Sequence, residues 1–136
     1  TYKPSTGFVG TDTFTYKASD GSCSSDPATV TLLVQKCPWS LNRELYEARC
    51  NVTLEVPASK GVLANDPTAI AVLNPEGITI DPKYGTLTVE ADGSFVYDPA
   101  ETIKSTTYVP FYYKATNGVC DSNEGFAKIA VICPCP

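Results

Sequence analysis

Six cysteines are the residues of this 136-residue chain whose chemistry is most readily defined. They follow neither a CxxC…CxxC spacing nor a Cys/His pattern, so a zinc site is not expected. Disulfide bonds suit cysteines in loop-like settings, and they persist in oxidising compartments outside the cytoplasm. The sequence therefore favours an extracellular or cell-surface protein. The six are Cys23, Cys37, Cys50, Cys120, Cys133 and Cys135.

Catalytic chemistry is not indicated by the remaining polar residues. The chain has no histidine, so a Ser-His or Cys-His nucleophile pair cannot form within it. No glycine-rich phosphate loop opens a helix, and nothing singles out a carboxylate pair for glycoside cleavage. We therefore expect no catalytic residues and no enzyme. The aspartates are expected to form turns; they are Asp12, Asp20, Asp26, Asp66, Asp81, Asp92 and Asp98.

The charge pattern excludes a nucleic-acid partner. The net charge is −5, the pI is about 4.6, and the ten basic residues are scattered singly. A basic patch or stripe is the usual electrostatic footprint of nucleic-acid binding, and none is present. No apolar run approaches the roughly 18 residues of a membrane-spanning helix, so no membrane insertion is expected in this window.

Two further side chains are candidates for surface roles. Asn51-Val52-Thr53 is a sequon, so Asn51 is a candidate for N-glycosylation in a eukaryotic source. Trp39 is the one aromatic residue that we consider for glycan binding. The other aromatics in phase with inward strand faces are expected to form core; they are Phe14, Tyr16, Phe95, Tyr97, Phe111 and Tyr113.

A long internal repeat organises the chain. FTYKASDGSC at Phe14 to Cys23 returns as FYYKATNGVC at Phe111 to Cys120, with an offset of 97 (120 − 23). A period of this length indicates an array of domains rather than a solenoid of short repeats. Residues 1–36 match only the second half of the later unit. We therefore expect 37–136 to be a complete domain, and 1–36 to be the C-terminal half of a preceding one in a longer polypeptide.

Period-two alternation of apolar residues predicts an all-β fold. Turn signals recur every 8–12 residues, Asp92-Gly93 is a strong hairpin signal, and no amphipathic helix is evident. The segment 41–50 fits either a strand or a short helical turn followed by a strand. About eight short strands per hundred residues favour an antiparallel sandwich of two sheets. The other expected strands are 11–18, 28–35, 51–56, 69–73, 77–80, 86–89, 94–97, 108–116 and 126–132.

Three motifs carry a resemblance to a known family. They are GVLAND at 61–66, YGTLTVEADGSFVYDP at 84–99 and FVGTDTFTYKASDG at 8–21. Together they resemble the tandem bacterial Ig-like or cadherin-like repeats of large surface adhesins. That resemblance implies Ig-like β-sandwiches strung into extracellular stalks, which space and stiffen, sometimes adhere, and usually do no chemistry.

The resemblance also raises calcium, which many family members bind between repeats through an acidic run after Asn-Asp. Here Asn65-Asp66 is followed by Pro-Thr-Ala-Ile, so the oxygen-rich ligand set that calcium requires is missing. No metal ligand or other cofactor is therefore expected, and calcium is the one alternative that stays open. The cysteines depart from the family, whose repeats usually lack them, and we expect disulfides to supply the stiffening instead.

The Ig-like topology that the resemblance implies predicts a pairing of the cysteines. The start of the domain and the loop before its last strand lie at one end, so Cys37 is expected to pair with Cys120. The first and last strands finish at the other end, where Cys50 is expected to pair with Cys133. Cys135 matches Cys37 (135 − 37 = 98) and is assigned to the next unit. Cys23 is expected to need a partner before residue 1.

The resulting hypothesis is a structural one: a disulfide-stiffened spacer or fibre-forming repeat of an extracellular surface protein or filament. Its partners would be neighbouring repeats. The alternative is a glycan- or protein-binding adhesion module that uses the loops at one end of the sandwich. The apolar face of residues 1–36 must be covered. We favour cover by the same polypeptide over strand complementation from a neighbouring molecule in a filament.

Overall fold

The computed structural model describes residues 1–135 and divides the chain into two compact units, Thr1–Lys36 and Cys37–Pro136. The boundary falls where the sequence repeat places it. We call these units the first unit and the second unit. Each is described by itself.

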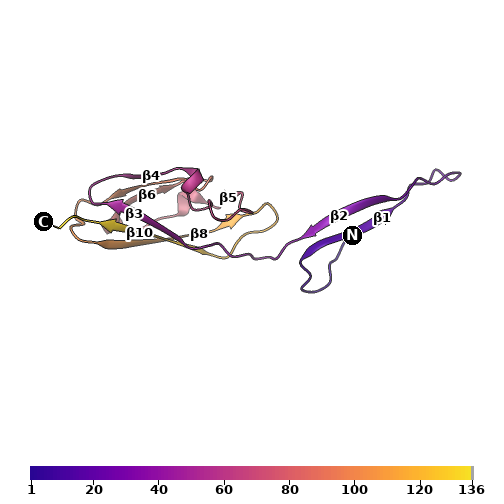
Figure 1. Ribbon diagram of the computed structural model, residues 1–136, viewed down its shortest axis with the longest axis horizontal. Coiled ribbons are helices and arrows are strands. Elements are labelled where there is room, and N and C mark those ends of the chain that lie inside the picture. The colour runs from indigo at the N-terminus through magenta and orange to yellow at the C-terminus, as the bar shows by residue number, and fades with distance from the viewer. Residues whose placement is uncertain (136) are drawn as a thin grey trace. The chain divides into compact units, whose positions relative to one another are not determined.

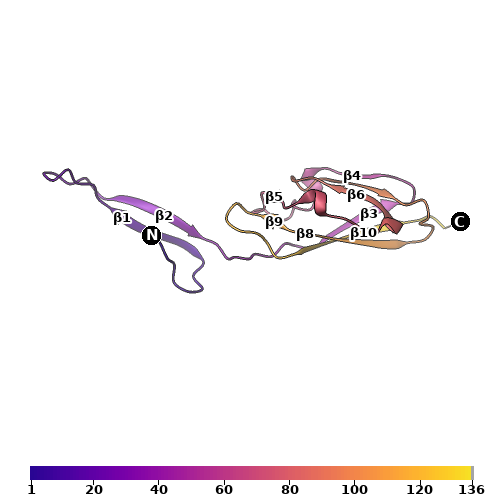
Figure 2. The same ribbon diagram turned by 180° about the vertical axis from the view of Figure 1, so that it is seen from behind.

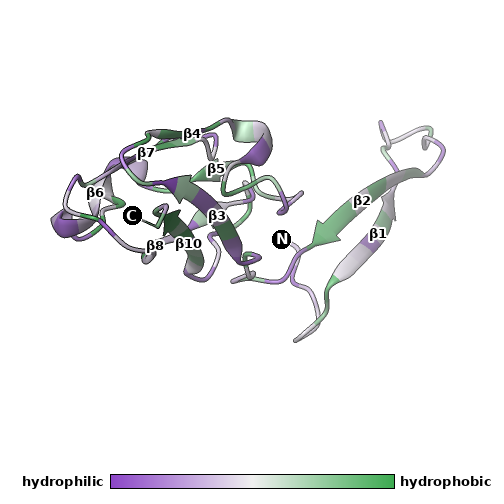
Figure 3. Ribbon diagram, turned by 60° about the vertical axis from the view of Figure 1, so that its left-hand side comes forward, coloured by the Kyte–Doolittle hydropathy of each residue, from purple (hydrophilic) through white to green (hydrophobic). Residues whose placement is uncertain are grey.

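The first unit is a single β-hairpin. Strand β1 (Gly10–Tyr16) pairs antiparallel with β2 (Ala28–Val34), and Phe14 lies opposite Val30. The loop between the two strands holds Cys23. Since no second sheet packs on this hairpin within the first unit, its apolar side chains are largely exposed. Figure 3 shows the hydrophobic colouring that runs along β2.

Residues 37–135 of the second unit form eight strands and three short 3₁₀ helices. Eight is also the number of strands that the sequence predicts. The strands are β3 (Glu44–Arg49), β4 (Leu54–Val56), β5 (Ala71–Val72), β6 (Gly85–Val89), β7 (Phe95–Pro99), β8 (Thr107–Tyr113), β9 (Ala115–Thr116) and β10 (Gly125–Ile132). The 3₁₀ helices are η1 (Ala58–Lys60), η2 (Pro75–Gly77) and η3 (Pro82–Tyr84).

These strands form two layers, which are visible from both sides in Figures 1 and 2. One layer has the order β3-β10-β8, and β9 continues from β8 to pair with β5. The other layer has the order β4-β7-β6. All pairs are antiparallel except β3 and β10, which run parallel. The expected all-β sandwich is confirmed, with one parallel pair inside it.

Aromatic side chains from both layers form the centre of the core. The Phe95 ring lies 4.8 Å from Tyr46 and 5.7 Å from Phe111, measured between ring centroids, both in edge-on geometry. Such edge-to-face pairs stabilise a core beyond the area that they bury. Tyr97 and Tyr113 are also buried, and their hydroxyls donate to the main-chain carbonyls of Tyr84 and Val62.

The GVLAND segment is shaped by close backbone packing. The Val62 amide donates to the Gly93 carbonyl at 2.9 Å, and Val62 is fully buried. A Cβ atom on Gly61 would collide with that same carbonyl, so only glycine is accommodated there. Gly93 has a φ of 86° in the predicted Asp92-Gly93 turn, which joins β6 to β7.

Some strand predictions are wrong in detail. Segment 77–80 forms no strand, because Pro75–Gly77 closes a 3₁₀ turn in which the Ile78 amide donates to the Pro75 carbonyl. Segment 69–73 keeps only Ala71–Val72, which has just two residues of β9 to pair with. The ambiguous segment 41–50 contains strand β3 and no helix.

The prediction that Phe14 and Tyr16 are core residues is wrong for the first unit as described. Their side chains are 48% and 55% exposed. Their repeat partners Phe111 and Tyr113 are buried in the second unit, where a second sheet packs on the hairpin. The pattern of alternation is the same, and the difference lies in what covers it.

Candidate functional site

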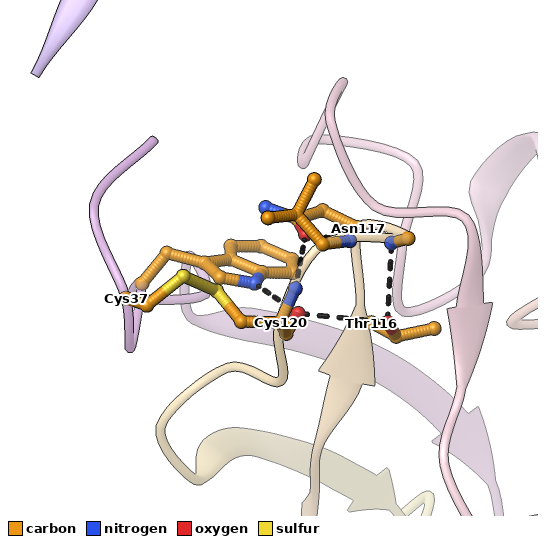
Figure 4. The surroundings of a disulfide bond; sticks show 7 residues. Cys37, Thr116, Asn117 and Cys120 are labelled. Atoms are coloured by element: carbon orange, nitrogen blue, oxygen red, sulfur yellow. Dashed lines mark hydrogen bonds between the residues drawn. A yellow bond between two sulfur atoms is a disulfide. The ribbon is translucent and has the colours of Figure 1, made fainter. Parts of the chain in front are cut away.

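The disulfide between Cys37 and Cys120 ties the start of the second unit to the loop before β10 (Figure 4). Its sulfur atoms are 2.01 Å apart and its Cα atoms 6.1 Å apart. Trp39 reinforces the junction, because its indole N–H donates to the Cys120 carbonyl at 3.2 Å. Its own carbonyl accepts from the Asn123 amide at 2.7 Å.

These contacts define the role of Trp39 in the structure. The side chain is half-buried and its N–H is bonded to the cysteine loop, so it helps to hold the disulfide in place. Glycan binding by Trp39 stays a prediction.

A second disulfide joins Cys50 to Cys133 at the end of β3 and β10, with Cα atoms 5.1 Å apart. The parallel register of the two strands brings these residues together. Ile132 is opposite Arg49, and the Cys50 amide donates to the Ile132 carbonyl at 3.2 Å. The two bridges join the pairs that the Ig-like topology predicts.

One register runs through both disulfides. Each bridge spans 83 residues of sequence. The same separation links Trp39 to Ser122 (122 − 39 = 83), which form an isolated parallel bridge, and Glu44 to Ala127 in the strand pair (127 − 44 = 83). Residues 37–50 and 120–133 are therefore two parallel segments in one register with a disulfide at each end. We call this pair the cross-linked ladder.

The loop that carries Cys120 is shaped by local polar bonds. The Asn117 side-chain oxygen accepts from the Val119 and Cys120 amides at 2.9 and 3.0 Å. Gly118 has a φ of 84°, which favours glycine. The buried Ser122 hydroxyl accepts from the Ala115 amide at 2.9 Å, so this main-chain donor is satisfied inside the fold.

The loop that carries Cys23 has the same bonds, although Cys23 is unpaired and exposed. Seven hydrogen bonds of this loop have a counterpart in the Cys120 loop, 97 positions further along the chain. The two distances of each pair agree within 0.2 Å. With the first-unit distance before the second-unit distance, they are Ala18 N to Ser25 Oγ (2.9, 2.9 Å), Ser25 N to Ala18 O (2.8, 2.8 Å), Asp20 N to Cys23 O (3.3, 3.3 Å), Gly21 N to Ser19 Oγ (3.2, 3.1 Å), Ser22 N to Asp20 Oδ1 (2.9, 2.9 Å), Cys23 N to Asp20 Oδ1 (2.8, 3.0 Å) and Ser25 Oγ to Asp26 O (2.9, 2.7 Å).

Strand register repeats as well. Phe14 opposite Val30 becomes Phe111 opposite Ala127, and the isolated bridge between Ser19 and Ser24 becomes one between Thr116 and Asp121. The repeated sequence therefore encodes the hairpin and its loop. It does not by itself bury them.

Cys135, like Cys23, is exposed and unpaired in the structure. Asn51, the sequon residue, is exposed in the turn after Cys50 with a φ of 58°. The Thr53 hydroxyl donates to Asp98 at 2.9 Å. Glycosylation of Asn51 stays a prediction that its exposure favours.

Sequence reasoning missed a pair of carboxylates near the start of β3. One oxygen of Asp66 accepts from the amide and side chain of Asn42 at 3.0 and 2.9 Å. The other oxygen of Asp66 and one of Glu44 are buried without a partner. Burial, together with the charge of Asp66, raises the pKa of Glu44 above its usual range. Asp66 was assigned to a turn, and the sequence gives no signal that Glu44 lies nearby.

Two tyrosine hydroxyls share this environment. Burial and the charge of Glu44 raise the pKa of both Tyr46 and Tyr113. Elsewhere in the core, burial followed by the charge of Asp98 raises the pKa of Tyr97 to about 12. These phenols stay protonated near neutral pH and act as hydrogen-bond donors.

Metal and membrane features can be stated for residues 1–135. In that range no group of three or more His, Cys, Asp or Glu side chains is arranged to hold a metal ion. No helix formed by those residues is long and apolar enough to cross a membrane.

Comparison with known families gives one match. A family model described as a bacterial Ig domain matches residues 1–33, which form the first hairpin. No curated protein matches the chain. The match agrees with the Ig-like strand order of the second unit, which contains the repeated copy of that hairpin. Fold and site together define an all-β, Ig-like module with two disulfides. Ig-like domains usually do no chemistry.

Proposed function

We propose that this chain is a structural repeat of an extracellular surface protein or filament, in which the second unit acts as a disulfide-stiffened spacer. The observation that carries the proposal is the cross-linked ladder. Disulfides and an Ig-like fold are both compatible with a module outside the cytoplasm.

The ladder limits how far the second unit can be stretched. Without cross-links, pulling on Cys37 and Cys133 would draw out 96 residues (133 − 37), or roughly 320–350 Å of chain. With the first disulfide, load passes from Cys37 to Cys120 and along 13 residues to Cys133. That path is at most about 45 Å long and consists largely of strand that is already extended.

The second disulfide provides a parallel path of equal length. Load can follow the 13 residues from Cys37 to Cys50 and cross to Cys133 (50 − 37 = 13). Residues 51–119, which hold most of the core, lie outside both paths. Each disulfide alone therefore limits the extension, and the two together divide the load between two strands. A spacer needs this property, whereas a small binding module does not.

Force spectroscopy tests the proposal through the total contour length at high force, which does not depend on whether a variant is folded. The full chain is held by handles at its two ends. We expect the oxidised chain at full extension to be shorter than the reduced chain by the 83 residues that the disulfides bypass (96 − 13 = 83), or roughly 270–300 Å.

Paired variants serve as matched controls. Removing Cys37 and Cys120 together, or Cys50 and Cys133 together, should leave the contour length short, because one path remains. Removing all four should give the full length. Full extension of the oxidised wild-type chain would rule out the spacer mechanism.

The adhesion alternative has less support. Its one aromatic candidate for a glycan is Trp39, whose indole N–H and main-chain carbonyl are both bonded to the segment around Cys120.

A further inference from the structure

The first unit exposes a surface whose repeated copy is buried. Phe14 and Tyr16 on β1 are 48% and 55% exposed, whereas Phe111 and Tyr113 are 1% and 3% exposed. Strand register and loop bonds are the same in both hairpins. The difference in exposure therefore comes from the rest of the second unit, which covers Phe111 and Tyr113 and has no counterpart in the first unit. An isolated two-stranded hairpin is marginally stable at best, so the exposed face needs a partner.

The second unit shows what covers its own copy of this hairpin. Residues 37–96 cover the repeated hairpin: β3 pairs with β10, Tyr46 packs on Phe95, and Phe95 packs on Phe111. The segment begins with Cys37, which is bonded to Cys120 of the loop. The free loop around Cys23 already has the shape that its copy has when bonded, so it needs no rearrangement to accept a cysteine.

We propose that the Cys23 loop and the exposed face of β1 and β2 bind an N-terminal half-sandwich of the kind formed by residues 37–96. This half-sandwich is carried by the same polypeptide, and a disulfide joins Cys23 to its leading cysteine. The inference deepens the proposed function, on which it rests, by naming the partner that makes the first unit a load-bearing spacer.

The covalent step is an ordinary thiol oxidation. Two thiols form one disulfide, and their two protons and two electrons pass to a disulfide oxidant such as oxidised glutathione, which leaves as two thiols. The first unit would hold one cross-link only. The position equivalent to Cys133 is Lys36 (133 − 97 = 36), so the second bridge of the ladder cannot form there.

A first experiment adds the missing half to the full chain. A copy of residues 37–96 is placed directly before Tyr2, so that Val96 continues into Tyr2 as it does into Tyr97. The added copy carries Ser40→Ala, an exposed position, so that its tryptic peptide differs in mass from the native one. The protein is refolded with oxidised and reduced glutathione and mapped without reduction.

We expect Cys23 to be bonded to the first cysteine of the added copy, and β1 to gain protection from amide exchange. The native pairs Cys37–Cys120 and Cys50–Cys133 report that the rest of the chain has folded. A free Cys23 in a chain whose native pairs have formed overturns the proposal. So does a disulfide from Cys23 to Cys135 of a second molecule.

A second experiment needs no added domain. Residues 115–124 of the second unit are replaced by residues 18–27, which transfers the Cys23 loop into the position of the Cys120 loop. We expect the transferred cysteine to bond to Cys37, with Cys50–Cys133 unchanged. If Cys37 stays free while Cys50–Cys133 forms, the loop is not a receptor for this segment. That failure would leave the contour-length test of the proposed function untouched.

Discussion

The loops around Cys23 and Cys120 have the same shape in different surroundings. Both are built by a side-chain oxygen that accepts from two following amides, a glycine with positive φ, and a serine that satisfies a main-chain amide. One loop is exposed and its cysteine is unpaired. The other is packed into a sandwich and its cysteine is bonded.

This difference separates two kinds of information in the sequence. The shape of the loop is encoded locally, because polar side chains bond amides two, three or seven residues away. Burial and the disulfide depend on residues 37–50, about 83 positions away in sequence. The same substitution made at equivalent positions of the two loops should therefore disturb the local bonds equally. It should lower the free energy of unfolding more in the Cys120 loop than in the Cys23 loop.

The disulfides should give the largest contrast. Removing Cys37 and Cys120 together as serines should lower the free energy of unfolding of the second unit by roughly 3–5 kcal/mol, since the bridge closes a loop of 83 residues. Cys23→Ser should change it by less than about 0.5 kcal/mol, as expected for an exposed position. Urea unfolding followed by circular dichroism measures both.

Peptide mapping without reduction must accompany this measurement. Trypsin separates Cys23, Cys37, Cys50 and Cys120 into different peptides. A mapped bond from Cys37 to Cys50, or from Cys120 to Cys133, would contradict the ladder and with it the reason for the contrast.

The paired serines offer the next contrast. Ser122→Ala should cost roughly 1–3 kcal/mol, because it leaves the buried Ala115 amide without an acceptor. Ser25→Ala removes the same bond from Ala18, but water can reach that exposed amide. We expect its cost to stay below about 0.5 kcal/mol. Equal effects at both sites would show that the first loop is already covered in the isolated chain.

Local and topological features were predictable from the sequence. Alternation located both hairpins, and Asp92-Gly93 located the turn between β6 and β7. The Ig-like topology placed four cysteines at the two ends of the sandwich. These predictions succeed because period-two patterns and turn residues act over a few positions, and because short connections allow few topologies.

Features that depend on tertiary contact were missed. Segment 77–80 has strand-forming residues, yet it finds no partner strand and follows a 3₁₀ turn at Pro75. The single register of the ladder follows from the parallel pairing of β3 with β10. No sequence pattern in either segment predicts this pairing. The pair of Glu44 and Asp66 joins residues 22 positions apart (66 − 44) through the fold alone.

The indole of Trp39 gives a smaller test of the same comparison, since only the Cys120 loop has this partner. Trp39→Phe keeps an aromatic ring and the main-chain bond to Asn123, but removes the N–H that donates to the Cys120 carbonyl. We expect a loss of about 0.5–1.5 kcal/mol in the second unit. Because Trp39 is the only tryptophan in the sequence, unfolding of the variant in urea is followed by tyrosine fluorescence. An unchanged stability would mean that the disulfide holds the loop without the indole.

The smallest expected effect concerns Glu44, which has no equivalent within residues 1–36. Its pKa is raised in the folded state by burial and by Asp66, so the folded protein holds the proton more tightly than the unfolded chain does. Stability is therefore fully present below the unfolded pKa of about 4.3 and is lost as pH rises through the folded pKa. Glu44→Gln removes this dependence, so it should raise the thermal midpoint at pH 7 by more than at pH 3.5.

Circular dichroism melts at both pH values measure this difference. Asp66, Tyr46 and Tyr113 face the same site. The two phenols stay protonated across this pH range, so neither tyrosine titrates in it. Asp66→Asn is the matched control: it removes the neighbouring charge while Glu44 remains, and should weaken the pH dependence without abolishing it. If Glu44→Gln raised the thermal midpoint equally at both pH values, the charge of the buried Glu44 would not destabilise the fold.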